Sequence, residues 1–251
     1  MSEAVNSLID YQDPDYALLY LDRIERYVGP AGITFHALGE LAQLLSARMK
    51  FEDPIRIAQL KLVQAGGAEA RPDPSSTDRI ERFRWDEIIP MLPPSVAAPA
   101  LSLFARLRLA RLVRRSVTLR FSSASRFRLQ RVKWLASLRG ARPLSQRYKL
   151  ERTWVERWLH MVDRSIVMHP EAAVEVVRTA ELIKGHGDVY QNGLSQWNVI
   201  IDDLVKPTCD GVLSLPALGN AVKEARQVSP EDHKRLMQVV GCLKMQGLAQ
   251  G

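Results

Sequence analysis

The most distinctive short run of chemically capable residues is Lys184-Gly185-His186-Gly187-Asp188. Two glycines one residue apart allow a tight turn, or a close approach of the backbone to another group. Exposed amides beside Lys184 would suit an anion at the start of the next helix, and His186 with Asp188 would suit an acid–base pair. A dinucleotide-binding loop needs a third glycine and a preceding strand, which are missing here. We therefore favour a turn between two helices, with Gly185 ending the first and Asp188 as the N-cap of the second.

Other residues with catalytic or metal-binding potential are scattered. The five histidines include no pair four residues apart, which argues against a metal site on a helix. The two cysteines, Cys209 and Cys242, fit no zinc or iron–sulfur spacing, and so low a number is typical of a reducing compartment. No Gly-x-Ser-x-Gly elbow and no phosphate-binding loop ending in Gly-Lys-Ser/Thr occurs. The sequence thus predicts no metal and no cofactor in this chain, and it assigns no catalytic residue.

A strongly basic segment, residues 105–152, holds 15 Lys or Arg and a single acid, Glu151. It carries a charge of +14 in a chain whose net charge is +7, so the remainder carries −7. Arginines can neutralise phosphates while the interleaved aromatic residues stack on bases. Many of these arginines, however, accompany leucines at helical spacing. We therefore favour an arginine-bearing helix pair that docks on an acidic partner, or on the acidic remainder of this chain, over nucleic acid, an anionic lipid or a phosphorylated ligand. The candidate docking face comprises Arg106, Arg108, Arg111, Arg114, Arg115, Arg126, Arg128 and Arg131.

Helical periodicity dominates the rest of the chain and predicts a mainly α, multi-helix globular fold. We divide it into an N-terminal helical part (1–65), a proline-rich connection with one short strand or hairpin near 79–89 (66–100), the basic helical segment (101–145) and a C-terminal helical part (146–251), which form one or two compact units. Within these, 101–120 is predicted to be helical, and 148–168 to be a long amphipathic helix with Leu150 facing inward.

Helix starts are marked by capping residues. Asp53-Pro54 is expected to begin one helix, and Ser229-Pro230 another, since a capping side chain followed by proline favours the first helical turn. Hydrophobic residues make up 46% and charged residues 25%, as in ordinary globular proteins. No apolar run approaches the roughly 20 residues that cross a bilayer. The start of the chain, with Glu3 and Asp10 and no basic cluster, is unlike a signal peptide, so we expect a cytoplasmic protein without a membrane span.

Three segments together resemble a known family: residues 10–17 (DYQDPDYA) followed by 19–23 (LYLDR), residues 49–58 (MKFEDPIRIA), and residues 180–188 (AELIKGHGD) with Gly193-Leu194 after them. In order and spacing they resemble the C-terminal region of the beta subunit of indolepyruvate oxidoreductases (indolepyruvate ferredoxin oxidoreductases). The resemblance covers roughly residues 8–205. Where the family often has an aromatic residue between the two glycines, this sequence has His186, so no ligand role is carried over to the turn.

The resemblance implies a function. The family oxidatively decarboxylates aryl 2-oxo acids to acyl-coenzyme A and passes electrons to ferredoxin or another acceptor. Its thiamine diphosphate and iron–sulfur clusters belong mainly to the large subunit, and its beta subunit normally begins with an α/β domain, for which this sequence has no pattern. By this resemblance the chain is a non-catalytic helical region. Its basic face would dock on the large thiamine-dependent subunit, or meet an acidic electron carrier or the phosphates of coenzyme A.

Two other classes of function remain open on the residues alone. A stand-alone basic helical module would bind nucleic acid or another polyanion, and its binding would weaken steeply as salt rises. A small independent enzyme would use His186 and Asp188 as its acid–base pair.

Overall fold

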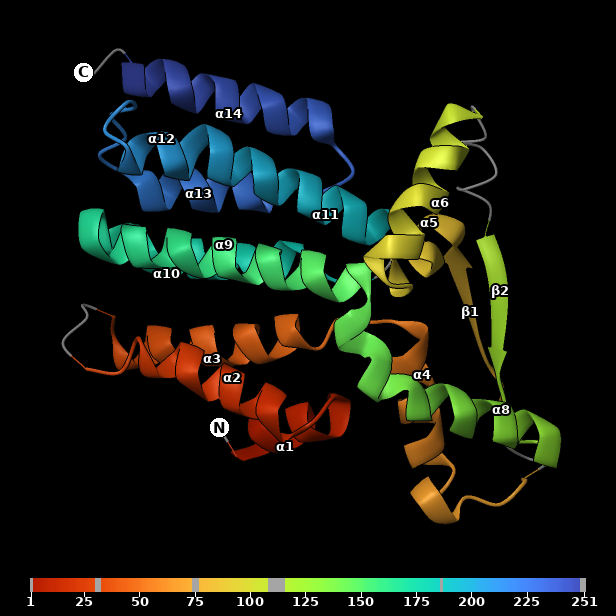
Figure 1. Ribbon diagram of the computed structural model, residues 1–251. Helices are drawn as coiled ribbons and strands as arrows, with labels where there is room; N and C mark the ends of the chain where they lie inside the picture. Colours follow the sequence, from red (N-terminus) through yellow and green to blue (C-terminus); the bar gives the residue numbers. More distant parts are fainter. Residues whose placement is uncertain (1, 30–32, 74–76, 108–115, 186, 249–251) are drawn as a thin grey trace. The chain divides into compact units, whose positions relative to one another are not determined.

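The computed structural model describes residues 2–29, 33–73, 77–107, 116–185 and 187–248 (Figure 1). The prediction of a mainly α fold is confirmed, with one small antiparallel sheet in the described residues. The chain forms two compact units: unit 1 comprises Met1–Asn6, Asp15–Lys50 and Thr153–Gly251, and unit 2 comprises Ser7–Pro14 and Phe51–Arg152. Each unit is therefore assembled from segments that lie far apart in the sequence.

Unit 1 is helical throughout its described residues. Its elements are the start of α1 (Ser2–Tyr11), α2 (Pro14–Glu25), α3 (Phe35–Met49), most of α9 (Gln146–Met168), η4 (Pro170–Ala172), α10 (Ala173–Arg178), η5 (Thr179–Leu182), α11 (Gly187–Ile200), the π-helical η6 (Ile201–Val205), α12 (Lys206–Cys209), α13 (Leu218–Gln227) and α14 (His233–Leu248). In Figure 1, α9 and α10 lie between the α2–α3 pair and the group formed by α11, α13 and α14.

Tryptophan and tyrosine side chains form the centre of unit 1. Trp158 of α9 is fully buried, and its indole N–H donates to the carbonyl of Val176 at 3.3 Å. The Tyr27 hydroxyl donates to the carbonyl of Leu159 at 3.2 Å, which joins the end of α2 to α9. Because a buried indole or phenol needs a hydrogen-bond partner, these bonds fix the helices in register as well as in contact.

Two predictions about helices are wrong in detail. Leu150 was expected to face inward but is 54% exposed, because the first turns of α9 bury the Arg147–Glu151 ion pair (2.8 Å) instead. The last helix does not begin at Ser229. It begins at His233, where the Asp232 carboxylate accepts the backbone N–H of Arg235 at 2.9 Å. A carboxylate in this position caps the helix as well as a serine would and also favours its dipole.

Unit 2 combines helices with a two-stranded ribbon. Its elements, besides the end of α1 and the start of α9, are α4 (Pro54–Gln64), η1 (Gly67–Glu69), β1 (Arg79–Arg84), α5 (Trp85–Ile88), η2 (Ile89–Met91), α6 (Pro94–Arg106), β2 (Ser116–Phe121), α8 (Arg126–Ser137) and η3 (Leu138–Leu144). The predicted start of a helix at Asp53-Pro54 is confirmed, since the Asp53 carboxylate accepts the N–H of Arg56 at 2.6 Å.

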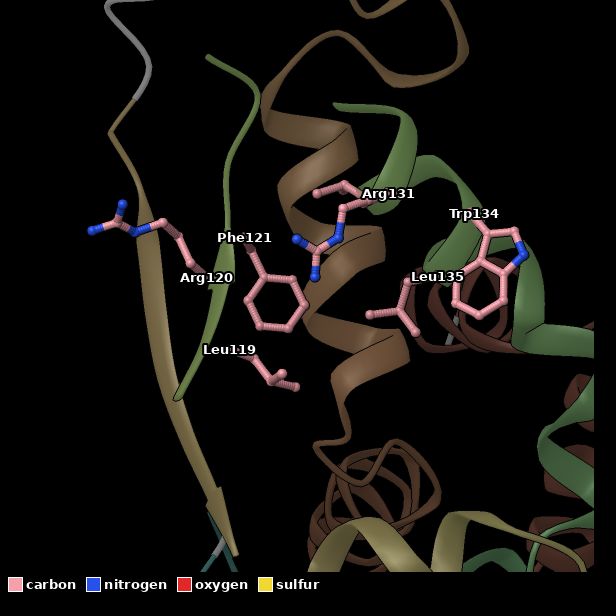
Figure 2. Close-up of a pocket in the computed structure, with 7 residues that line it drawn as sticks. Leu119, Arg120, Phe121, Arg131, Trp134 and Leu135 are labelled. Atoms are coloured by element: carbon pink, nitrogen blue, oxygen red, sulfur yellow. The ribbon is translucent and has the colours of Figure 1, made fainter. Parts of the chain in front are cut away.

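The ribbon corrects the expectation of a continuous helix over 101–120. The helix α6 ends at Arg106, and 116–121 is a strand that pairs antiparallel with β1, with Phe83 opposite Val117 and Arg79 opposite Phe121. Residues 108–115 of the predicted helix lie outside the described residues. The strand near 79–89 is shorter than expected and is not part of a local hairpin, because its partner strand lies more than thirty residues further along the chain. Successive side chains of β2 point to opposite faces of the ribbon, as in any strand. Leu119 and Phe121 point toward α8, while Arg120 points away from it (Figure 2).

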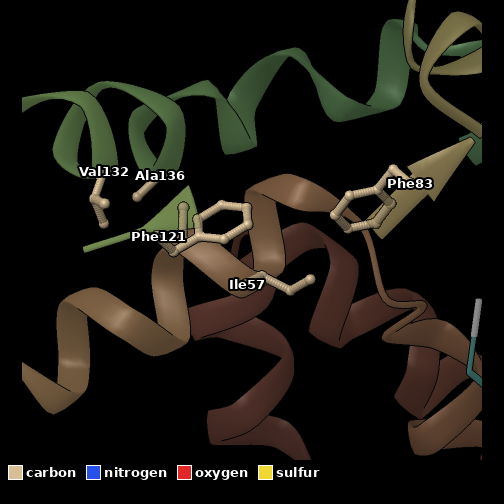
Figure 3. Packing of buried hydrophobic residues seen from close by; sticks show 6 residues of the cluster. Ile57, Phe83, Phe121, Val132 and Ala136 are labelled. Carbon is tan, nitrogen blue, oxygen red and sulfur yellow. The ribbon is translucent and has the colours of Figure 1, made fainter. Parts of the chain in front are cut away.

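The ribbon packs on a small hydrophobic cluster between α4 and α8 (Figure 3). Its buried members are Ile57, Ala58, Phe83, Phe121, Val132 and Ala136. A two-stranded ribbon is only marginally stable by itself in water, so contact of its inner face with the two helices is what holds it.

One buried ion pair joins the distant segments of unit 2. Arg142 is 2% exposed and Asp53 is 4% exposed. The Arg142 guanidinium donates to both Asp53 carboxylate oxygens, at 2.7 and 3.1 Å, and to the carbonyl of Tyr11 at 2.6 Å. It also donates to the side-chain oxygen of Gln12 at 3.2 Å and lies 3.9 Å from the centre of the Tyr11 ring. The charge is thus fully surrounded by acceptors, as a buried guanidinium requires.

We expect Arg142→Met to destabilise unit 2 by about 3–5 kcal/mol, because the buried Asp53 carboxylate would lose its counter-ion. Urea denaturation, together with hydrogen exchange of the amides of α4, would measure this. The matched control is Arg126→Met on the exposed face of α8, which should change stability by no more than about 0.5 kcal/mol. Equal denaturation midpoints for the two variants would contradict the prediction.

Candidate functional site

The predicted turn at 184–188 lies between η5 and α11. Gly185 and Gly187 both have left-handed backbones, with φ of 71° and 64°, so both glycines are needed for the turn. Lys184 and Asp188 are exposed, and His186 lies outside the described residues. The helix α11 begins at Gly187, so Asp188 lies in its first turn instead of capping it, and η5 already ends at Leu182, before Gly185. The run is therefore a helix–helix connection, as favoured from the sequence. The first helix ends earlier than predicted, at Leu182, and the second begins at Gly187, one residue before the predicted cap.

Contacts on either side hold this connection in place. The Arg48 guanidinium, buried in α3, donates to the carbonyl of Ile183 and lies 4.9 Å from the centre of the Trp154 ring. Gly193 of α11 lies directly against η5, since a Cβ atom at this position would be only 1.9 Å from the carbonyl oxygen of Leu182. No other residue type fits between the two backbones without a shift of one element. These residues thus position helices, and their geometry accounts for the run without a ligand.

A network of ion pairs surrounds the same elements. Arg178 donates to both carboxylate oxygens of Glu40, each at 2.7 Å, and to Glu175 at 2.8 Å. Arg226 contacts Glu175 at 2.9 Å and Glu181 at 2.5 Å. The hydrogen bonds from Arg178 lower the pKa of Glu40, against the opposing effect of partial burial, and the two carboxylates raise the pKa of Arg178. The network connects α3, α10, η5 and α13.

The candidate docking face is only partly described. Arg108, Arg111, Arg114 and Arg115 lie outside the described residues. Arg106, Arg126, Arg128 and Arg131 are exposed, and Arg128 comes within 3.9 Å of Asp78. Arg106 ends α6, and this end lies well apart from α8 in Figure 1. The described arginines therefore form no single face: three of them occupy the first half of α8, and the fourth lies elsewhere in unit 2.

The sequence did not reveal a large cavity within unit 2, with a volume of about 610 Å³. Its walls come from α4, α5, η2, β2, α8, η3 and the start of α9, and the Asp53–Arg142 pair lies among its lining residues. We call it the unit 2 cavity. A smaller pocket of about 110 Å³ adjoins it between β2 and α8 and shares Leu119, Arg131, Trp134 and Leu135 with it (Figure 2). One sign of this cavity was visible in the sequence, the aromatic residue Trp134 within the arginine-rich segment. Its side chain is 63% exposed.

The charged groups of the cavity are mostly paired. Asp53 binds Arg142, and Arg147 binds Glu151 at 2.8 Å. Arg131 forms no hydrogen bond or ion pair with the side chains that the structure describes, and its guanidinium points into the space between Phe121 and Leu135 (Figure 2). The cavity is thus an apolar space with one uncompensated positive charge, an arrangement typical of sites for small amphipathic anions.

The described residues include no group of three or more His, Cys, Asp or Glu side chains placed to hold a metal ion. Within the same described ranges, no helix is both long and apolar enough to cross a membrane. Of the two free cysteines, Cys209 is buried and its pKa is raised by burial, which disfavours the reactive thiolate.

The fold and site together define a mainly α-helical protein of two compact units, one of which contains an apolar cavity with Arg131 among its lining residues. The chain belongs to the DUF6537 family, described as a family of unknown function, whose sequence profile matches residues 1–203. No curated protein and no solved structure gives a significant match.

We expect Gly193→Ala to lower the free energy of unfolding by about 1–3 kcal/mol, since its methyl group overlaps the Leu182 carbonyl. The control is Gly241→Ala in α14, where no atom beyond the adjacent residues and the backbone of its own helix lies within 4 Å of the new Cβ. That change should be neutral or stabilising by up to about 1 kcal/mol, because alanine favours helix interiors. Thermal and urea denaturation of both variants would test the difference. A Gly193 variant as stable as the Gly241 variant would be contrary to it.

We expect Glu40→Gln to cost stability only above acidic pH. The pKa of Glu40 is lower when folded than its ordinary value of 4.5, so its ionised form stabilises the native state above that pH. This contribution is lost as the pH falls through the folded pKa. Because both partners are partly exposed, the loss at neutral pH should be at most about 1 kcal/mol. Urea denaturation from pH 3 to 7 would measure it, and a difference between the two proteins that is constant with pH would argue against the role.

Proposed function

We propose that this chain is a helical, non-catalytic docking domain of an indolepyruvate oxidoreductase-type complex. The complex would oxidatively decarboxylate aryl 2-oxo acids to acyl-coenzyme A in the cytoplasm. Thiamine diphosphate and iron–sulfur clusters would reside in the large partner subunit. The sequence resemblance over roughly residues 8–205 supports the complex, and the surface of α8 supports the docking role.

The structural observation that carries the docking role is the mixture of exposed arginines and exposed aromatic residues on α8. Arg126 and Arg128 flank Phe127, which is 73% exposed. Arginine and aromatic side chains are enriched in protein interfaces, where they combine apolar burial with charge-assisted hydrogen bonds. The positive charge of this helix would match an acidic surface on the large subunit. It would equally match an acidic electron carrier or the phosphates of coenzyme A, since these are also negatively charged.

Co-expression with a tagged, large thiamine-dependent subunit from the same source tests the proposal. The chain should co-purify at low salt and dissociate as the ionic strength rises. The double variant Arg126→Glu with Arg128→Glu should reduce the association rate by about tenfold or more, since charges at the edge of an interface mainly steer the encounter. Surface plasmon resonance at two salt concentrations would measure that rate.

The matched control reverses two neighbouring charges in unit 1, Lys234→Glu with Arg235→Glu, and should leave the association rate unchanged. Failure of the unaltered chain to associate at low salt would overturn the proposal. Exposed aromatic residues between arginines would also suit bases and phosphates. Tight binding to DNA or heparin with a steep salt dependence, in place of subunit binding, would establish the nucleic-acid or polyanion alternative.

A further inference from the structure

We propose that the unit 2 cavity binds one molecule of an alkyl carboxylate, with the alkyl chain inside the cavity and the carboxylate beside Arg131. The inference concerns unit 2 alone and does not depend on docking to another subunit. It rests on three features of the cavity: its walls, its charge and its two exposed tryptophans.

The walls select an aliphatic ligand. Eight of the fifteen apolar residues that line the cavity have branched aliphatic side chains: Ile55, Ile88, Leu92, Val117, Leu119, Leu135, Leu138 and Leu144. Side chains of this shape surround an alkyl chain well, while Phe51, Trp85 and Trp134 supply the aromatic part of the lining. The volume of about 610 Å³ lies within the range of about 300–1,000 Å³ that is usual for small-molecule sites. Because the walls come from seven separate elements, they surround a ligand on several sides instead of offering one helix face to it.

The charged residues that line the cavity favour a ligand with one negative charge. Of the four charged side chains that line the cavity, Arg142 and Asp53 neutralise each other, and Arg147 is paired with Glu151. Arg131 alone among them has no described counter-ion. A carboxylate matches a guanidinium with two parallel hydrogen bonds, which makes this pairing stronger than one with a neutral head group.

Two exposed tryptophans suit the junction between the alkyl chain and its head group. Trp85 of α5 and Trp134 of α8 both line the cavity, and both are exposed. Tryptophan rings commonly lie where an apolar environment meets water, because the ring is apolar and its N–H is polar. An alkyl chain that packs against them would cover apolar surface now open to solvent.

Isothermal titration calorimetry with octanoate, decanoate and dodecanoate, each below its micellar concentration, tests the proposal on the whole chain. We expect saturable binding of one molecule per chain, with affinity that rises about threefold to fourfold per added methylene until the cavity is filled. Dodecan-1-ol, which lacks the charge, should bind at least about tenfold more weakly than dodecanoate.

Two variants separate this site from non-specific adsorption. Arg131→Gln should raise the dissociation constant for dodecanoate by about tenfold, because the charge-assisted pair is lost. Arg126→Gln, on the same helix but outside the cavity lining, should leave it unchanged. Both positions are exposed, so both variants should fold, and circular dichroism melting curves would verify this.

Several results would overturn the proposal. They are the absence of saturable binding, equal affinities in the Arg131 and Arg126 variants, and tighter binding of an aromatic acid such as indole-3-propionate than of dodecanoate. A further such result is binding of the chain to phosphatidylglycerol vesicles but not to monomeric dodecanoate. That result would show that the basic, aromatic surface binds membranes, and it would contradict a ligand site in the cavity.

Discussion

The burial of the Arg142 guanidinium is the constraint on which unit 2 depends. A charge removed from water must be met by acceptors, and here they come from two places that lie far from η3 in the sequence: the end of α1 and the residue that caps α4. The Asp53 carboxylate has two tasks, since it both pairs with Arg142 and caps α4. The position of α4 is thereby tied to the segment that follows α8. Because those two helices bound both the hydrophobic cluster and the cavity, the ion pair sets the spacing within which both exist.

Capping residues and the spacing of apolar residues were sufficient to predict much of the helical fold from the sequence. Asp53 caps α4 as its residue type predicts, and the period of apolar residues located α9. The strand β2 was missed because arginines and leucines before it continue a helical pattern, while Val117, Leu119 and Phe121 show their alternation over only six residues. Its partner strand, β1, lies more than thirty residues earlier in the chain, so the residues next to β2 gave no sign that it pairs in a ribbon.

The functional features were harder to predict, because they depend on contacts between distant residues. Arg142 looks like any other member of the basic segment, and only its partner 89 residues away distinguishes it as buried. The cavity likewise has no compact sequence signature, since its lining comes from short pieces of seven elements. The glycine-containing turn was recognisable from its residue types, but its packing function was not, because the carbonyl that excludes a side chain at Gly193 belongs to a preceding element.

The contact between Gly193 and the Leu182 carbonyl has a consequence for comparing related chains. Residues 180–188 with Gly193 are among those through which this sequence resembles another family, and they lie where two backbones touch. Any chain with this helix crossing must retain glycine at the point of closest approach, whatever it binds. Likeness in this run therefore reports inherited architecture. Divergence in activity would be sought in the exposed positions of α8, where substitution leaves the scaffold intact.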